Sequence, residues 1–471
     1  MCSSDLTSLA AHEFGLAWFE QVKAEGNGGG ITFKKHLIMG STRRENKYGI
    51  NFSELHATGL HDGFLQGDPP GTQCVGVVDQ YYGVVDHDAG QHDHAKENND
   101  RQVDAEYFQA DVVKAYLAQS GIIGTALGPM SPGTAYILLH HYMGEVDGSI
   151  GAWGYARGGM GAITQALASS FKASGGTVLT GAGVEKVLVR GGRAMGVVLS
   201  NGDEHLAATV ISNADVNRTF LKLVDETDLP EDFVRQVRNF KMRGSSGKVN
   251  IALDSLPEFP ALPKDRPCIR GGLHFTDSVE RIERAYDDWK DGRWSADPFL
   301  DMMIPSTIDP TIAPPGKHFM SCFVQYCPPK VEGRDWTPKD RAAFGETVIS
   351  QIADYSPGFR DRIIHMEVRT PRELEEEVGL TEGNIFQGEL TFDQLMFNRP
   401  IPGYAQYRSP IKGLYMCGSS THPGGGVMGA PGRNAAVEIL RNLSKSSAHV
   451  SPAHEVRSEE HTSELQSRRN L

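Results

Sequence analysis

Residues 413–440 read GLYMCGSSTHPGGGVMGAPGRNAAVEIL, and the interpretation of the whole chain starts from this stretch. Gly424, Gly426 and Gly429 have the GxGxxG spacing of a dinucleotide-binding loop. The short apolar run before them predicts a strand, and the run after them predicts a helix over residues 429–443. A complete fingerprint continues into a second strand that ends in a ribose-binding acid, and that part does not follow here. The spacing alone is equally consistent with a tight packing turn.

Length and charge narrow the classes of protein that the chain can be. Its 471 residues allow a large core and two or three domains. The net charge of -13 argues against a nucleic-acid partner, because affinity for phosphates comes mainly from clustered Lys and Arg. The apolar runs are too short for a membrane span, and no signal-peptide pattern opens the chain. We therefore expect a soluble protein of the cytoplasm, or alternatively of the mitochondrial matrix.

The six cysteines are too few and too scattered for a disulfide framework. Cys322 and Cys327 have the CxxxxC spacing of a redox pair, within a run that predicts a strand. Residues five apart on a strand point to opposite faces, so two buried, unreactive thiols are the favoured interpretation.

Both ends of the chain resemble sequencing-adapter DNA in translation. Residues 457–467, RSEEHTSELQS, match one adapter strand, and residues 1–6, MCSSDL, match its reverse complement. We therefore leave residues 1–6 and 457–471 out of the fold prediction, as one would an expression scar, and expect residues 446–471 to form a disordered tail. The expected consequence is that the gene fragment lacks its natural start.

Residues 7–105 carry no clear structural pattern, and we assign them no function. His87, His92 and His94 stand among aspartates there and could be imagined as a metal site. No apolar periodicity holds these side chains in place, so a solvated loop is favoured.

Regular patterns begin after residue 105. Helical spacing predicts helices within residues 107–124, 158–176, 230–240, 278–289 and 339–355. Apolar and β-branched runs predict strands within residues 177–180, 184–192, 193–202, 204–215, 247–254 and 318–326. His140 and His141 are adjacent, so on a strand they could not face one ligand together, and core or surface histidines are favoured.

Several longer stretches resemble one known family of flavoproteins. They are GTAYILLHH, GAWGYARGGMGAITQALA, MRGSSGKVNIALD, GNIFQGELTFDQLMFNRP and the glycine-rich stretch itself. Together they are similar to phytoene-desaturase-like flavoproteins of the amine-oxidase superfamily, within it the pyridine nucleotide-disulfide oxidoreductase domain-containing protein 2 group. The resemblance covers residues 107–443 in the same order.

This resemblance implies FAD as cofactor, with the last strand and helix closing its site. Gly418 and Ser419 would lie beside the ribityl-phosphate part, and Val184 would touch the adenine through its backbone. The remaining implied positions pass the flavin ring or begin the helix at its pyrimidine end: Thr421, His422, Pro423, Gly424, Gly425, Gly426, Val427, Met428 and Gly429.

The resemblance also implies an α/β fold of mixed α+β character with two domains. Residues 106–215 and 409–445 would form an incomplete, Rossmann-like FAD-binding domain with a small antiparallel sheet. Residues 216–408 would form a substrate domain with a mixed sheet and helices. The family begins with a βαβ unit that carries the true GxGxxG, and this unit is not found in the chain.

The implied activity is FAD-dependent oxidation, with a hydride passing from a substrate C–H bond to flavin N5, and the expected substrate is a small apolar molecule. The alternative is a binding or regulatory protein that keeps the fold without turnover. Gln387 stands where the family often has His, and no catalytic base is assigned. Lys248 shares a strand face with Asn250 and is a possible active-site group, although a solvent-facing lysine is favoured. His422 is expected near the ring, with a structural hydrogen bond as the alternative role.

Overall fold

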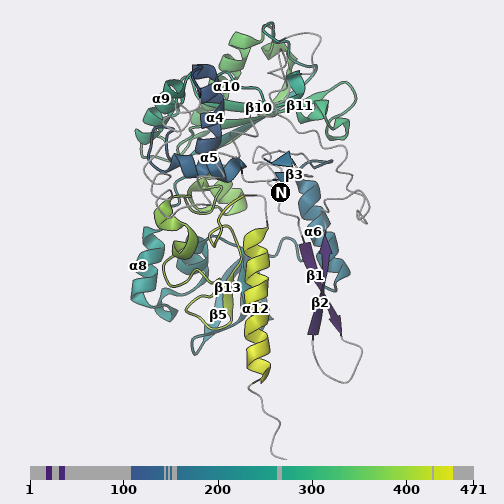
Figure 1. Ribbon diagram of the computed structural model, residues 1–471, viewed down its shortest axis with the longest axis vertical. Coiled ribbons are helices and arrows are strands. Elements are labelled where there is room, and N and C mark those ends of the chain that lie inside the picture. Colours follow the sequence, from purple (N-terminus) through teal and green to yellow (C-terminus); the bar gives the residue numbers. More distant parts are fainter. Residues whose placement is uncertain are drawn as a thin grey trace, which may run out of the picture.

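The structure is a computed structural model that describes residues 17–23, 31–37, 108–142, 145–146, 149–150, 156–262, 268–426 and 429–448. The histidines at positions 87, 92 and 94 and both adapter-like ends lie outside these residues. Figure 1 shows two bodies, an upper one with α4, α9, α10, β10 and β11 and a lower one with α8, β5, β13 and α12. Helix α5 and strand β3 lie at the level where the two bodies meet.

A four-stranded antiparallel sheet is the centre of the upper body. Its order is β10-β11-β9-β12, with β9 at Ser246–Leu253, β10 at Phe299–Met303, β11 at His318–Gln325 and β12 at Ile363–Arg369. Alternate residues of β9 and β11, such as Val249 and Val324, are fully buried against α10 (Pro338–Tyr355), which contributes Phe344 and Val348 to the same core. The period-2 pattern of these strands therefore directs one sheet face to this helix.

Helices α4 (Asp111–Ile122) and α9 (Val279–Lys290) pack together in the upper body through a second cluster. Ile122, Ile282 and Trp289 belong to it, together with Phe299 of β10. Helix α10 begins with a capping box, because the Thr337 side chain accepts a hydrogen bond from the backbone of Asp340 and the Asp340 carboxylate accepts one from the backbone of Thr337.

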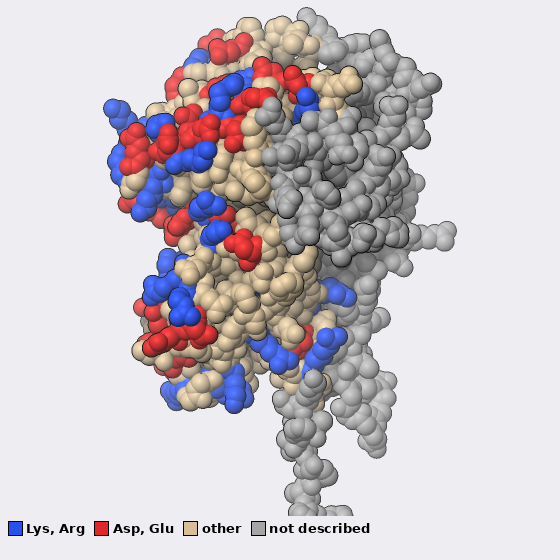
Figure 2. Space-filling view, turned by 60° about the vertical axis from the view of Figure 1, so that its left-hand side comes forward, with Lys and Arg blue, Asp and Glu red and all other residues tan. Residues whose placement is uncertain are grey.

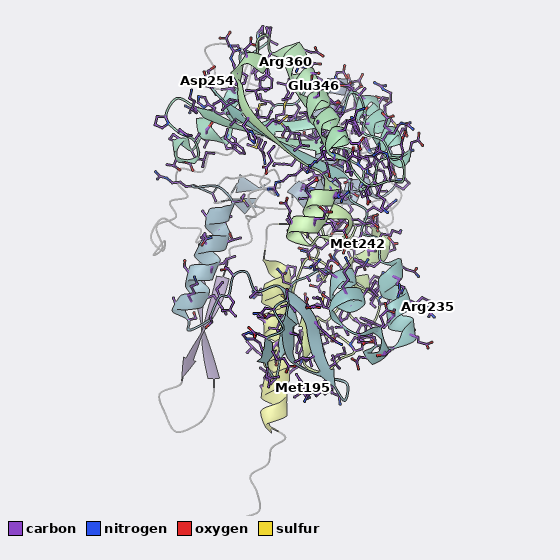
Figure 3. All side chains as sticks on the ribbon, turned by 180° about the vertical axis from the view of Figure 1, so that it is seen from behind. Met195, Arg235, Met242, Asp254, Glu346 and Arg360 are labelled. Atoms are coloured by element: carbon purple, nitrogen blue, oxygen red, sulfur yellow. The ribbon has the colours of Figure 1, made fainter. Side chains whose placement is uncertain are left out.

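The lower body contains a three-stranded antiparallel sheet and a separate parallel pair. Strands β5 (Val184–Arg190), β6 (Arg193–Leu199) and β7 (Glu204–Leu206) form the sheet. Strand β8 (Val210–Ser212) pairs in parallel with β13 (Leu414–Met416), so segments two hundred residues apart lie side by side. Helices α8 (Glu231–Asn239) and α12 (Ala430–Ala448) complete this body. Figure 3 shows Met195 on its lower part and Met242, a member of its core, near the level where the bodies meet.

The remaining helices and strands are shorter or lie at the sides. They are β1 (Ala17–Lys23), β2 (Ile31–Leu37), β3 (Glu145–Val146), β4 (Ser149–Ile150), α5 (Thr134–Tyr142), α6 (Gly161–Ala173), α7 (Val216–Arg218) and α11 (Pro371–Glu373).

The predicted helices and most predicted strands are confirmed, with two corrections. Residues 177–180 form no strand, although their β-branched run predicted one. Val178 and Leu179 are 40% and 58% exposed there, so no neighbouring strand covers them. Residues 204–215 do not form one continuous strand but divide into β7 and β8, which belong to different sheets. The domain limits at 215 and 408 stay a prediction; the core that contains β13 also includes Phe220 and Phe233.

The surface and the helices add two observations. On the face seen in Figure 2, acidic and basic side chains are intermixed over both bodies. Among the described residues, no helix combines the length and the apolar character that crossing a bilayer requires.

Candidate functional site

The glycine-rich stretch, residues 417–429, connects β13 to α12, and we call it the glycine loop. Cys417 continues the strand pairing, since its backbone N–H donates to the Ser212 carbonyl at 2.9 Å. The chain then turns twice. The Thr421 hydroxyl donates to the Gly418 carbonyl at 2.8 Å, and the Gly424 N–H donates to the Thr421 carbonyl at 2.8 Å. The loop then leads to the N-terminal end of α12, where unpaired N–H groups favour negative charge.

Backbone conformation at Gly424 and close packing at Gly425 explain why these two positions need glycine. Gly424 has a φ of +115°, which other residues rarely adopt. A Cβ added at Gly425 would lie 2.4 Å from Cδ1 of Phe386 and 2.9 Å from its Cα. Packing therefore accounts for the glycine at position 425 without any ligand, and the spacing alone could not have identified a cofactor.

Arg399 donates hydrogen bonds that connect the loop to a preceding segment. Its guanidinium is fully buried, and its Nε and Nη2 donate to the Ser419 carbonyl at 2.9 and 2.6 Å. The other N–H groups donate to four carbonyls of a preceding segment: Phe386, Gly388, Glu389 and Gln394. One side chain thus ties residues 386–394 to the glycine loop.

Two aromatic side chains fix the middle of the loop. The Tyr407 hydroxyl donates to the His422 carbonyl at 2.9 Å. Nε2 of His140, on α5, lies 3.2 Å from the Gly425 carbonyl, and because a carbonyl only accepts, this nitrogen carries the hydrogen. His140 and His141 both lie on a helix rather than a strand, and both are buried. The interpretation of the two residues as core histidines is therefore confirmed.

Gln387 contacts the loop from the segment that Arg399 organises. It is a non-glycine residue with a φ of +53°, and its carbonyl accepts a 2.6 Å hydrogen bond from the Ser420 hydroxyl. The same hydroxyl accepts the Val216 N–H at 3.0 Å. A non-glycine residue in the left-handed region is a common feature of functional sites.

Burial and the Arg399 charge keep the histidines of the site neutral. The pKa of His422 is lowered by desolvation and, to a smaller extent, by the positive charge of Arg399. Desolvation and Arg399 also lower the pKa of His140, against the opposite effect of its bond to Gly425. Desolvation lowers the pKa of Arg399 itself to about 9, so the guanidinium stays charged at neutral pH.

The structure brings most of the predicted site residues together and leaves others apart. Residues 418, 419, 421–426 and 429 lie along the one loop. Val427 and Met428 lie outside the described residues. Val184 opens β5 and is 38% exposed on the three-stranded sheet, so its expected contact with adenine stays a prediction.

Lys248 is a correction, because its side chain was expected to face solvent and is only 3% exposed. It lies on β9, which has a neighbouring strand on each side. Across the sheet, Lys248 pairs with Phe323 and Phe323 pairs with Asp301, so the three side chains share one face. Phe323 packs with Phe386, which contacts the glycine loop. This row of side chains therefore leads from the upper sheet to the loop.

A polar group adjoins this row. Nε2 of His274 lies 3.8 Å from Oδ1 of Asp301, and Tyr116 of α4 meets the His274 ring edge-on at 5.6 Å. Desolvation raises the pKa of Asp301 and lowers that of His274, so both groups are biased toward their neutral forms. Desolvation also raises the pKa of Tyr116 to about 12.

The cysteine pair is buried and not joined by a disulfide. Cys322 and Cys327 are free thiols with no exposed surface, as the favoured interpretation predicted. Burial raises the pKa of Cys322 to about 12 and that of Cys327 well above its usual value. Among the residues that the structure describes, no group of His, Cys, Asp and Glu is arranged to hold a metal ion.

Comparison with known families identifies the family of the chain. The family described as flavin containing amine oxidoreductase matches residues 87–440, which is most of the chain. The chain belongs to this family. FAD is therefore the cofactor indicated for it, and the mixed α/β architecture agrees with the expected fold class.

Three curated proteins illustrate which sequences this chain is similar to. "Pyridine nucleotide-disulfide oxidoreductase domain-containing protein 2" of Rattus norvegicus is 41% identical over 72% of the chain and 60% of the relative. "Prolycopene isomerase 2, chloroplastic" of an Oncidium hybrid is 29% identical over 60% of the chain and 45% of the relative. "Phytoene desaturase (lycopene-forming)" of a Paracoccus strain is 26% identical over 67% of the chain and 60% of the relative. The chain thus spans about 60% of the length of the rat protein.

Two buried polar atoms at the loop lack a hydrogen-bond partner that a bound ligand could supply. Oε1 of Gln387 and Nδ1 of His422 are buried without a hydrogen-bond partner among these residues. Unpartnered buried polar atoms are costly, and a polar ligand against the loop would satisfy them. Oε1 of Gln387 lies 3.0 Å from the position that a Cβ would take at Gly418, so this atom faces the start of the loop.

Three residues of the site were missed from the sequence: Arg399, His140 and Tyr407. Arg399 lies in GNIFQGELTFDQLMFNRP, which was noted only as a stretch of family resemblance. Arginines are mostly exposed, so nothing in the sequence indicated that this one is completely buried. The tertiary structure alone reveals it.

Proposed function

We propose that this chain is part of an FAD-dependent oxidoreductase whose glycine loop closes the cofactor site. The observation that carries the proposal is the loop itself: it is held by Arg399, His140 and Tyr407, and it leads into the N-terminal end of α12. Such rigid support is what a cofactor-binding loop needs to keep its backbone groups in position.

Each group of residues has a distinct role in this proposal. Gly418 and Ser419 would lie beside the ribityl-phosphate part of FAD, and Gly424 to Gly426 would approach the ring, because no side chain intervenes. The start of α12 would favour negative charge at the pyrimidine end. Bound FAD supplies the redox chemistry by accepting a hydride from a substrate C–H bond at N5.

The chain's own contribution is binding, orientation and exclusion of water rather than proton transfer. His140 already uses Nε2 on the Gly425 carbonyl, and the low pKa of His422 keeps Nδ1 free to accept a hydrogen bond at neutral pH. Gln387 offers an amide where proton transfer would require an imidazole. We assign no catalytic base.

The proposed substrate is a small molecule that is mainly apolar. Two relatives carry names that refer to phytoene and prolycopene, which are apolar polyenes. In the structure, Phe323 and Phe386 form an apolar cluster between the upper sheet and the loop. Asp301 and Lys248, on either side of Phe323, would contact any polar end of the substrate.

Flavin uptake and reduction test this function. The cofactor-free chain is mixed with FAD, passed through a desalting column, and its visible absorption is recorded before and after anaerobic addition of a polyene or a primary amine. Retained flavin bands that the polyene bleaches are the expected result. No retained flavin, either in this chain or in one to which a family-type N-terminal βαβ unit has been added, would refute the cofactor role of the loop. Retained flavin that only dithionite bleaches would instead support the binding or regulatory alternative.

A further inference from the structure

Arg399 combines complete burial with a charge that has no ionic partner among the described residues. The guanidinium is fully buried, and all of its hydrogen bonds go to neutral backbone carbonyls. The nearby Glu389 carboxylate does not neutralise it, since that carboxylate binds Arg243 at 2.7 Å. Phe240 stacks beneath the guanidinium at 5.8 Å and contributes only a cation–π contact.

A buried cation normally has a carboxylate beside it, because desolvating an unpaired charge is expensive. Five carbonyls with well-formed hydrogen bonds stabilise the cation, but they do not cancel its charge. In a region with little water, the remaining field extends further than it would at a surface. The field of Arg399 therefore reaches groups that the side chain does not touch.

The glycine loop lies within this field. The position that a Cβ would occupy at Gly424 is 3.4 Å from Nε of Arg399, and the Ser419 carbonyl is bound directly. Two side chains on the loop and beside it lie within reach of this charge: desolvation is the main cause of the lowered pKa of His422 and of His140, and the Arg399 charge lowers both further. A group bound against the loop would experience the same positive potential.

We propose that Arg399 is a positioning residue whose buried charge makes the glycine loop favour added negative charge, so that it raises the reduction potential of a flavin bound there. The inference rests on the proposed function for the position of the flavin. Hydride transfer breaks the substrate C–H bond, forms the N5–H bond, oxidises the substrate and leaves one negative charge on the ring. The Arg399 charge stabilises that product relative to the oxidised ring.

Three substitutions separate the charge of Arg399 from its hydrogen bonds. R399Q removes the charge, and R399K keeps the charge but loses the fork that binds several carbonyls. Q394E places a carboxyl group beside an intact Arg399, because the Gln394 amide and Nη1 of Arg399 both donate to the Glu389 carbonyl, at 3.5 and 3.1 Å. The Gln394 amide also donates to the Lys241 carbonyl at 3.1 Å, so Q394E loses this hydrogen bond and its folding is checked together with that of R399Q.

R360Q is the matched control. It removes the same charge from Arg360, which is half exposed and pairs with Glu346 in the upper body, as Figure 3 shows. Because that charge is paired and solvated, its loss should not change the field at the loop.

The first measurement uses the chain loaded with FAD. Sulfite adds to flavin N5 and leaves the ring negative, so its affinity reports the electrostatic potential at the ring. The midpoint reduction potential of the flavin is measured as the second readout. R399Q and Q394E should lower the midpoint potential and weaken sulfite binding on the order of tenfold, whereas R399K and R360Q should not. A shift in R399K as large as that in R399Q would overturn the proposal, because loop geometry rather than charge would then be responsible.

The second measurement needs no cofactor. The titration of His422 is followed by NMR in the cofactor-free chain, where R399Q and Q394E should raise its pKa and R360Q should leave it unchanged. Equal pKa values in all four proteins would refute the inference. Failure to bind FAD, both in the wild-type chain and in one with an added N-terminal βαβ unit, would refute the proposed function alone, since the His422 titration would still report the field of Arg399.

Discussion

Replacing Gly425 by alanine tests whether the glycine loop must keep its observed path. The added methyl group would lie 2.4 Å from Cδ1 and 2.9 Å from Cα of Phe386, both well inside van der Waals contact. The ring of Phe386 belongs to a buried cluster and has little room to move. The loop must therefore shift away, and the shift would also weaken the bond from His140 to the Gly425 carbonyl.

The expected magnitude follows from these contacts. Overpacking of a filled core costs about 1–3 kcal/mol, and the lost hydrogen bond adds about 1 kcal/mol. If about 2 kcal/mol of this penalty falls on the loop geometry that binds FAD, the affinity for FAD drops about thirtyfold. F386L should restore only part of this loss, because the Cα of residue 386 would still lie too close.

Urea unfolding and FAD titration, run on the same preparations, measure the two effects. G432A is the matched control: a Cβ there meets nothing within 4 Å, and the residue lies on α12. The control should be neutral or stabilising by about 0.5–1 kcal/mol. Wild-type stability and FAD affinity in G425A, or an equal loss in G432A, would show that the loop path does not depend on this contact.

Three further predictions concern pH, thiol reactivity and helix capping. His140 faces Arg399, Tyr136 and His141, and its pKa is lowered in the folded chain. The unfolded chain therefore binds a proton at this histidine more readily than the folded chain does. The free energy of unfolding should fall as pH drops through about 6.5, and it should fall less steeply in H140Q. A thiol reagent at about pH 8 should label Cys322 only after unfolding, because burial shields the thiol and raises its pKa to about 12. Labelling of the native chain would contradict this burial. T337A should destabilise α10 by about 1 kcal/mol in thermal unfolding, and an unchanged melting temperature would mean that the capping box contributes nothing.

The sequence predicted the local elements better than it predicted their surroundings. The helices α6, α8, α9 and α10 are where helical spacing places them, because that spacing depends on neighbouring residues alone. The strand predicted over residues 177–180 is wrong because a strand needs a partner, and a short β-branched run does not show whether one exists.

The site shows the same division. The strand, loop and helix of residues 413–443 were predicted from spacing, and FAD was predicted from resemblance. Lys248 was placed on the correct strand, but alternation could not show that both sides of β9 are occupied and its side chain is buried. Arg399 could not be found at all, because its role depends on carbonyls from residues 386–394 and 419 that only the folded chain brings together.

The parallel pairing of β8 with β13 has a consequence for biosynthesis. Ser212 leaves the ribosome about two hundred residues before its partner strand, so β8 lacks this partner while most of the upper body is made. Contacts between such distant segments form slowly, because a long loop has to close first. The upper sheet, whose strands lie within residues 246–369, can form earlier. We therefore expect the lower body to be the last part to mature and the part of the nascent chain that most needs a chaperone.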